Sequence, residues 1–217
     1  MLNIVLADCD LELVPQSLLT HPVVIGYAKK RKKQAKMTIL DDNFHHLAIR
    51  KSFPDSPQEQ RRGRPDIVHF NMVYILDSIA NLQGKVRMFI HTRNNQVITV
   101  NPATRIPRSY ARFVGVMEKL LFEGKVTSEE GADLLEVEDD ITLPELLKRL
   151  RPAKVVGFSV TGGKEELGAL LEGDTTAVVG GFSKGDFISK FTPDVWVSVY
   201  PEELMSWTVV AEIMKYV

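Results

Sequence analysis

The amino-acid sequence predicts an α/β fold with an open parallel sheet, and three short strands near the C-terminus carry this prediction. Apolar runs rich in β-branched residues cover 155–160, 175–179 and 195–199. Each run ends on glycines or on a proline, and helical patterns follow at 165–171 and 202–216. Loops in this position lie at the carboxyl ends of parallel strands, where open α/β sheets bind their ligands.

The chain begins with a continuous apolar run at Leu2–Ala7, which predicts a short buried strand. Three more elements are expected next: a helix at Pro22–Lys36, a strand at Thr38–Leu40 and a helix at Asn43–Lys51. The segment Ser52–Arg62 is polar and contains prolines, so it predicts a loop.

The middle of the chain predicts two helices and a hairpin. Pro65 suits the first position of a helix, and Gly124 marks the end of another. Asn94-Asn95 separates two alternating runs, a pattern typical of a hairpin. The expected helices are Ile67–Asn81 and Tyr110–Glu123, and the expected strands are Lys85–His91 and Gln96–Val100.

Acidic residues cluster between Glu129 and Asp140, and this segment is assigned neither a helix nor a strand. After it, Thr142 and Glu145 form a capping-box pattern for a helix over Leu143–Leu150. Two helices of the C-terminal third complete the prediction, Glu165–Leu171 and Glu202–Tyr216.

Charge is segregated along the chain although the formal net charge is only −1. Residues 1–112 carry 17 Lys and Arg against 9 Asp and Glu, whereas residues 113–217 carry 10 against 19. The densest positive run is 29–36, at the end of an expected helix, where cations also stabilise the helix dipole. The asymmetry favours a basic surface for a polyanion in the first half.

Two arginine clusters strengthen this interpretation. Arg61, Arg62 and Arg64 directly precede a helix, and the planar guanidinium group holds phosphates bidentately. Asp66 lies in the first turn of that helix, where capping alone would explain a carboxylate. The second cluster contains Arg105, Arg108 and Arg112, spaced three and four residues apart. A solvated face is the alternative, but two clusters favour contacts with a nucleic-acid backbone.

The stretch Val178–Phe187 contains three glycines, Gly180, Gly181 and Gly185. Either they form an ordinary turn after a strand, or they let a ligand approach bare backbone. The spacing is not that of a dinucleotide fingerprint, and Asp186-Phe187 follows Gly185 where a P-loop requires Lys-Ser or Lys-Thr. A ligand here is therefore not expected to be held by its phosphates.

Several classes of protein are not supported by the sequence. The single cysteine, Cys9, rules out a disulfide framework and indicates a reducing, cytoplasmic compartment. No apolar run approaches the roughly 20 residues that span a bilayer. His45-His46 lack metal-ligand spacing, so we expect packing or hydrogen-bonding roles and no metal site.

Two long motifs and the glycine loop resemble one known family. The motifs Arg61–His69 and Asn101–Arg108, followed by Gly180–Gly185, look like the ribosome-biogenesis rRNA (pseudouridine-N1-)-methyltransferases of Nep/Emg type. These belong to the SPOUT methyltransferase superfamily. The resemblance covers nearly the whole chain and implies a SPOUT-type parallel sheet with a C-terminal trefoil knot. Because the chain starts directly at its first strand, we expect the archaeal form.

The resemblance also implies a cofactor, S-adenosyl-L-methionine, held in three loops near the knot. It implies one domain over 1–217, with an RNA-binding elaboration within about 22–112 and a cofactor-binding knot region at about 154–217. The cofactor-binding positions carried over from the family are Thr161, Gly180, Gly185, Ser198, Val199, Tyr200, Pro201, Glu202, Glu203 and Leu204.

On the RNA side, the resemblance implies contacts with small-subunit rRNA from both arginine clusters: Arg61, Arg62, Arg64, Arg105, Arg108 and Arg112. Asp66 would either orient Arg64 or accept the proton from the target base. A homodimer is expected, and ribosomal assembly proteins are candidate partners. Two alternatives stay open: a non-catalytic RNA-binding factor for small-subunit assembly, and the same chemistry on another RNA.

Overall fold

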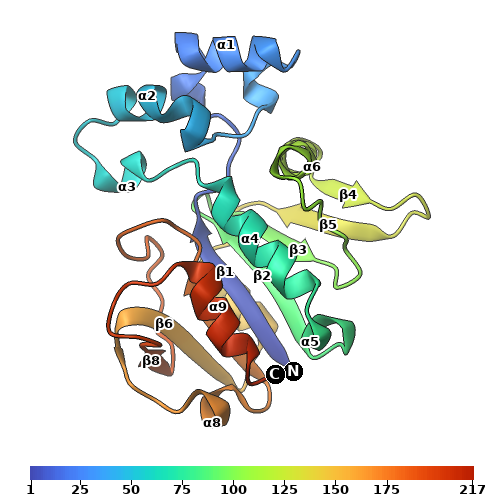
Figure 1. Ribbon diagram of the computed structural model, residues 1–217, viewed down its shortest axis with the longest axis vertical. Helices are drawn as coiled ribbons and strands as arrows, with labels where there is room; N and C mark the ends of the chain where they lie inside the picture. The colour runs from blue at the N-terminus through green and yellow to red at the C-terminus, as the bar shows by residue number, and fades with distance from the viewer.

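The computed structural model describes all 217 residues, and an eight-stranded mixed sheet forms its centre (Figure 1). The strand order is β4-β5-β3-β2-β1-β7-β6-β8. The strands are β1 (Leu2–Cys9), β2 (Val86–Thr92), β3 (Val97–Val100), β4 (Lys125–Thr127), β5 (Asp133–Glu138), β6 (Lys154–Gly163), β7 (Thr175–Gly180) and β8 (Val195–Val197).

Nine α-helices surround the sheet. They are α1 (Pro22–Lys30), α2 (Asp42–Ser52), α3 (Pro57–Gln60), α4 (Pro65–Leu76), α5 (Ile79–Leu82), α6 (Tyr110–Glu123), α7 (Leu143–Leu150), α8 (Leu167–Leu171) and α9 (Ser206–Met214). Two 3-10 turns, η1 (Gln16–Leu18) and η2 (Ala35–Met37), flank α1. None of these helices has both the length and the apolar character needed to cross a bilayer.

Strand β1 lies in the middle of the sheet and pairs in parallel with β2 and β7. Every residue of β1 is buried, as expected for a parallel strand covered on both faces. Ile4 and Leu6 join the larger core cluster, whereas Val5 and Ala7 join the smaller cluster with α7. The alternation of β1 side chains therefore separates two packed layers.

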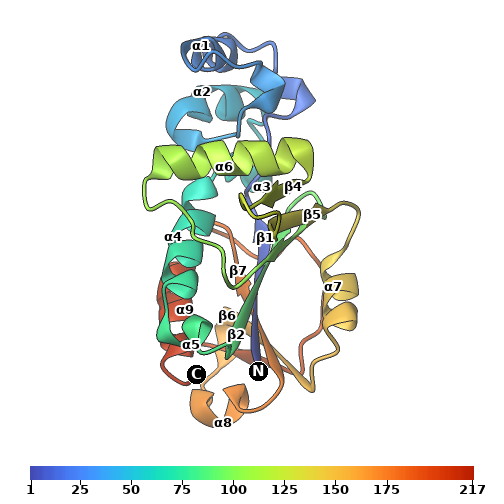
Figure 2. The same cartoon turned by 90° about the vertical axis from the view of Figure 1, so that its right-hand side faces the viewer.

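The two faces of the sheet are covered by different helices. Figure 2 shows α4, α5 and α9 on one side and α7 on the other. A third, smaller cluster lies at one end of the molecule, where α1 and α2 pack together above the rest (Figure 1). Its members include Val24, Leu40 and Ile49. The basic first half thus contributes a projection with its own small core.

The parallel arrangement predicted from the three C-terminal strands is right for β6, β7 and β8, and β1 and β2 join the same parallel set. β3, β4 and β5 pair antiparallel at one edge. The hairpin of β2 and β3 is confirmed. β5 lies in the acidic segment that was assigned no element, and β4 lies just before that segment. Leu135 of β5 is buried, and the acidic residues around it are exposed or half-buried on this outer pair. The acidic side chains obscured the alternation of polar and apolar residues that would have predicted β5 as a strand.

Several helix boundaries were predicted correctly, notably α6 and α7. α6 ends at Gly124, whose φ of 84° is left-handed. The proposed capping box of α7 is wrong, because the Thr142 side chain makes no cap hydrogen bond. The first predicted helix ends at Lys30, and the last begins at Ser206 instead of Glu202. A short helix, α3, interrupts the predicted loop 52–62.

Candidate functional site

A cavity of about 360 Å³ lies beyond the carboxyl ends of β6, β7 and β8. Three segments line it, each at or just beyond the carboxyl end of one of these strands: 158–161, 179–187 and 197–206. The switch in strand order between β7, β6 and β8 brings the three loops together. Among its lining residues are Thr161, Gly180, Gly185, Ser198, Val199, Tyr200, Glu202, Glu203 and Leu204.

These lining residues include every position carried over for the cofactor except Pro201. Pro201 is exposed beside the cavity and does not line it. Sequence reasoning missed the aromatic side chains Phe158, Phe182 and Phe187, which also line it. Phe182 lies within the glycine stretch and Phe187 follows it closely, so the sequence alone could have indicated aromatic residues at this loop.

Two glycines of the cavity fit their positions for different reasons. Gly185 has a φ of 80°, which side chains with a Cβ rarely adopt. At Gly180 an added Cβ would lie 2.6 Å from Cζ of Phe182. The Phe182 ring therefore packs directly against the Gly180 backbone, and a side chain at position 180 would push this ring out of the cavity wall.

A further glycine, Gly162, was not singled out from the sequence. A Cβ there would lie 2.6 Å from the backbone nitrogen of Val197. The amide of Ser198 also donates to the Gly163 carbonyl at 2.8 Å. The end of β6 therefore lies directly against the chain leaving β8, which shapes the cavity.

Below the cavity, Asp8 holds the segment that follows the glycine loop. Its carboxylate accepts hydrogen bonds from the amides of Ile188 and Ser189 at 2.6 and 2.9 Å, and from Ser189 Oγ at 2.6 Å. Burial raises the pKa of Asp8, but hydrogen bonds involving His91 and Ser189 outweigh this effect and lower it. Asp8 has a φ of 52°, an unusual left-handed conformation that aims its side chain at this segment.

Arg61 and Arg62 are not on an exposed surface, which corrects the expectation that they contact RNA. The Arg61 side chain is 1% exposed, and its Nη1 donates to the carbonyls of Lys184 and Asp186. Arg62 pairs with Glu12 and Glu59. Both guanidinium groups are held by partners from other segments, so they are unavailable to phosphates in this fold.

Arg64, the third arginine of this cluster, is half-buried at the start of α4. Its Nε and Nη2 donate to the two oxygens of Asp66 at 2.8 and 2.7 Å. This bidentate pair fixes the direction of the guanidinium plane. The geometry fits the orienting role considered for Asp66.

The second cluster differs, because Arg105, Arg108 and Arg112 are all exposed. The segment that carries them is anchored by its backbone. The His69 ring nitrogen Nε2 lies 2.8 Å from the Pro107 carbonyl, and Asn81 donates to the Pro102 carbonyl at 2.9 Å. Only Arg108 has a carboxylate partner, the exposed Asp77 at 3.3 Å, and exposed arginines on a fixed segment are suited to bind phosphates.

The basic run 29–36 is divided between packing and solvent. Arg31 and Lys33 both pair with Glu118, whose side chain is 1% exposed on α6. These pairs tie the α1 projection to the rest of the molecule. The remaining lysines are exposed: Lys29, Lys30, Lys32 and Lys36.

The adjacent histidines have separate environments. His45 is buried, and its Nδ1 accepts a hydrogen bond from the Asp41 amide at 3.0 Å. Burial lowers the pKa of His45 to about 4, so the ring is neutral. His46 is exposed. Within the whole chain, no group of three or more His, Cys, Asp or Glu side chains is arranged to hold a metal ion.

Comparison with known proteins assigns this arrangement to a family. The model of the EMG1/NEP1 methyltransferase family matches residues 4–217. The chain is 44% identical over 219 residues to the ribosomal RNA small subunit methyltransferase Nep1 of Thermococcus onnurineus, covering 99% of this chain and 96% of that relative. It is 40% identical over 218 residues to the Methanothrix thermoacetophila protein of the same name, covering 99% and 94%.

A solved structure has the same fold. The crystal structure of Archaeoglobus fulgidus Nep1 bound to S-adenosylhomocysteine matches with a TM-score of 0.85 at 34% sequence identity. The match covers 99% of this chain and 95% of that chain.

Proposed function

The chain belongs to the EMG1/NEP1 methyltransferase family, and from this premise we propose that it methylates N1 of a pseudouridine in small-subunit ribosomal RNA. It is a methyltransferase, and its cofactor is S-adenosyl-L-methionine. The proposal adds the target base and the residues that serve it. Action on ribosomal RNA also makes the cytoplasm the proposed location.

The cavity at the ends of β6, β7 and β8 is the observation that carries the proposal. Its lining combines aromatic rings, bare glycine backbone and the carboxylates of Glu202 and Glu203. We propose that this lining holds an adenine ring against backbone and rings, with carboxylates near the positive charge of the cofactor. The bound cofactor supplies an electrophilic methyl group on its sulfonium. The cavity residues orient that group and exclude water.

On the RNA side, we propose that Arg64, Arg105, Arg108 and Arg112 hold phosphates of the target. Three of them are exposed, and Arg64 is half-buried at the start of α4. Single-stranded loops suit such a site, because their bases leave the stack at low cost.

Methylation at N1 requires that this nitrogen lose its proton. Pseudouridine is joined to ribose through carbon, so its N1 carries a hydrogen that can be replaced. Asp66 is the carboxylate next to the phosphate-binding arginines, and both of its oxygens are occupied by Arg64. This pairing favours an orienting role over that of proton acceptor.

We further propose that the chain forms a homodimer through the face of α4, α5 and α9. Large apolar side chains are exposed there, and Figure 1 shows α4 and α9 side by side. They are Phe70, Tyr74, Ile79, Leu82 and Tyr216. Light scattering tests this assignment: Phe70→Asp should be monomeric, whereas Ile25→Asp, an exposed site on α1, should remain dimeric. A dimeric Phe70→Asp contradicts it.

The trefoil knot is likewise proposed. β8 follows β7 in the chain but pairs beside β6, and the last residues of β6 contact the backbone at Val197 and Ser198. These contacts are next to the point where the C-terminal segment would pass through the loop that leaves β6. A chain trace in experimental density tests the path, and an unthreaded path contradicts it.

Tritiated methyl transfer tests the proposed function. Small-subunit rRNA fragments carrying either uridine or pseudouridine at one position should differ, with incorporation only in the second. Equal incorporation contradicts the pseudouridine assignment, and incorporation into another RNA would change the substrate. Cofactor binding without any transfer would favour a role in assembly alone, with ribosomal assembly proteins as partners.

A further inference from the structure

Arg61 connects the turn that carries Arg64 to the glycine loop of the cofactor cavity, although the two lie far apart in the sequence. The guanidinium group lies between residues 182–187 and the segment just after the end of β1. Its Nη1 donates to the Lys184 carbonyl at 3.1 Å and to the Asp186 carbonyl at 2.8 Å. Its Cζ lies 4.1 Å from the centroid of the Phe182 ring. One buried side chain thus contacts three residues of the cofactor loop.

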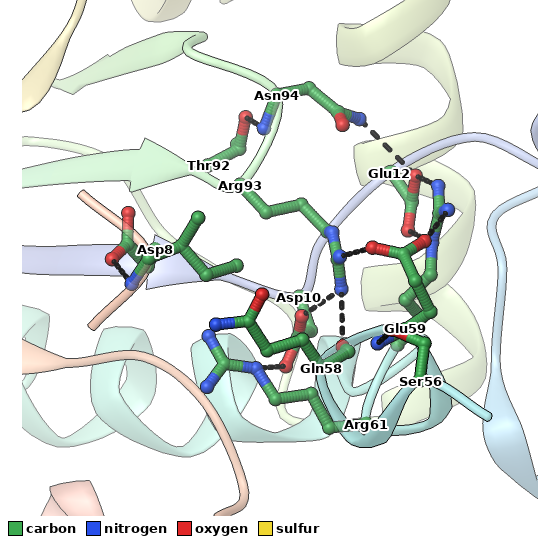
Figure 3. Close-up of polar contacts among 12 residues, drawn as sticks. Asp8, Asp10, Glu12, Ser56, Gln58, Glu59, Arg61, Thr92, Arg93 and Asn94 are labelled. Atoms are coloured by element: carbon green, nitrogen blue, oxygen red, sulfur yellow. Dashed lines mark hydrogen bonds and ion pairs between the residues drawn. The ribbon is translucent and has the colours of Figure 1, made fainter. Parts of the chain in front are cut away.

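The other side of Arg61 faces Asp10, just beyond the end of β1. Arg61 Nε lies 3.4 Å from Asp10 Oδ2, and Arg93 Nη1 donates to Asp10 Oδ1 at 2.8 Å. Figure 3 shows Asp10 between these arginines, with Glu59 on the far side of Arg93. The Asp10 side chain is fully buried. The charges are therefore mutually dependent, because water cannot replace a lost partner.

Asp10 also holds the RNA-facing turn through its backbone. The amide of Arg64 donates to the Asp10 carbonyl at 2.9 Å, and the Asp42 amide donates to the Gly63 carbonyl at 2.8 Å. Gly63 fits tightly there, since an added Cβ would lie 2.9 Å from the Asp42 nitrogen. If Arg64 moves toward a phosphate, its backbone therefore displaces Asp10 and the residues that connect Arg64 to Arg61.

We propose that Arg61 is a positioning residue that couples RNA binding at Arg64 to the shape of the cofactor loop. RNA that fixes the turn at Gly63 and Arg64 also fixes Arg61 and, through its two carbonyl partners, residues 184–186. The cofactor then binds a loop that is already ordered, so each ligand strengthens binding of the other. This inference rests on the proposed function, because it takes RNA and S-adenosylmethionine as the two ligands.

Arg62 provides a matched control for Arg61. It is the next residue, and it pairs with carboxylates of Glu12, beyond the end of β1, and Glu59 on α3. It has no hydrogen bond to the cofactor loop. Loss of either arginine removes a buried ion pair, but only loss of Arg61 removes the connection to Lys184 and Asp186.

Calorimetry with S-adenosylhomocysteine, with and without a saturating hairpin RNA that carries one pseudouridine, tests the coupling. We expect RNA to tighten binding to the wild type by about fivefold or more. Arg61→Met should bind S-adenosylhomocysteine about tenfold more weakly and lose the RNA effect. Arg62→Met should keep both, and Arg61→Lys should recover part of the loss because it keeps the charge and a donor.

An RNA effect that is the same in Arg61→Met as in the wild type overturns the proposal. A wild type that binds S-adenosylhomocysteine and transfers methyl groups, but with an affinity independent of RNA, overturns the coupling and leaves the proposed function standing. A wild type that does not bind S-adenosylhomocysteine overturns both.

Amide hydrogen exchange of the wild type keeps the proposal falsifiable if Arg61→Met does not fold. The hairpin RNA should slow exchange at residues 182–189 in the absence of any cofactor. Exchange that RNA leaves unchanged in this segment overturns the coupling.

Discussion

The two arginine clusters have the same composition and opposite environments. Arg61 and Arg62 are enclosed by carboxylates and carbonyls from other segments, whereas Arg105, Arg108 and Arg112 point into solvent. The environments differ because the two clusters lie against different segments of the chain. The first cluster meets the end of β1, where Asp10 and Glu12 are buried, whereas the only acid paired with the second cluster is the exposed Asp77. A high density of arginine in a sequence therefore indicates a phosphate-binding surface only where no buried acidic residues pair with those arginines.

Buried and exposed arginines therefore have different roles. A buried arginine organises the elements around it, and an exposed one remains free for a ligand. Arg64 combines both, since Asp66 fixes its direction while part of it stays accessible.

The largest expected effect is on folding. Arg61→Met leaves the buried Asp10 with Arg93 alone, and removing one partner of a buried ion pair should lower the free energy of unfolding by about 3 kcal/mol. Arg108→Met should change it by less than about 0.5 kcal/mol, because that side chain is 83% exposed. Urea denaturation measures both. Equal losses would show that the two clusters are not different in kind.

The second effect concerns the glycine loop that Arg61 contacts, which is proposed to bind the cofactor. An added Cβ at Gly185 would lie 3.6 Å from Arg61 Nη1, and the φ of 80° is unfavourable for a branched residue. Gly185→Val should weaken binding of S-adenosylhomocysteine by about 100-fold or more and leave RNA binding largely intact.

Gly173→Val is the matched control for this change. Gly173 has a similar φ of 84°, and nothing lies within 4 Å of an added Cβ. It should have the same backbone strain without a loss of cofactor affinity. If calorimetry finds normal affinity for Gly185→Val, the glycine loop is an ordinary turn.

Much of this architecture could be predicted from local patterns. The stop at Gly124 defined α6, and the apolar runs with glycine ends located β6, β7 and their loops. The environment of Arg61 could not be predicted, because Asp10 and Lys184 approach it only once the sheet has formed. β5 was missed for a related reason: a strand of alternating acids and apolar residues resembles a solvated loop when its partners β3 and β4 are unknown. Patterns within one segment were informative, and pairings between distant segments were not.

A third prediction compares the carboxylates that face arginines. Asp66→Asn removes the charge that orients Arg64, so RNA affinity should fall about tenfold while kcat of bound RNA changes little. Asp77→Asn is the control, because Asp77 pairs with the exposed Arg108 at 3.3 Å and should have almost no effect. Filter binding and single-turnover kinetics separate the two parameters. Normal affinity with loss of turnover across the pH range would identify Asp66 as the proton acceptor.

The smallest expected effect is a pH dependence of the free energy of unfolding, which we expect only from the cluster around the buried Asp10. Burial raises the pKa of Asp10 to about 7, against the opposing influence of Arg61 and Arg93. Glu12 also raises it, and Cys9 and the backbone of Arg64 are its other close neighbours. The carboxylate paired with the second cluster, Asp77 beside Arg108, is exposed and not buried.

The sign follows from proton binding. The unfolded chain loses the Asp10 proton near pH 4, whereas the folded chain keeps it until about pH 7, so the folded state binds more protons in between. The stability that Asp10 contributes is therefore full below pH 4 and is lost as pH rises through 7. Relative to Asp10→Asn, the wild type should lose about 1 kcal/mol of unfolding free energy between pH 6 and pH 8. Histidines and other groups are common to both proteins and cancel in the difference measured by urea denaturation. A difference that is constant with pH would mean that Asp10 stays ionised and that its arginines outweigh burial.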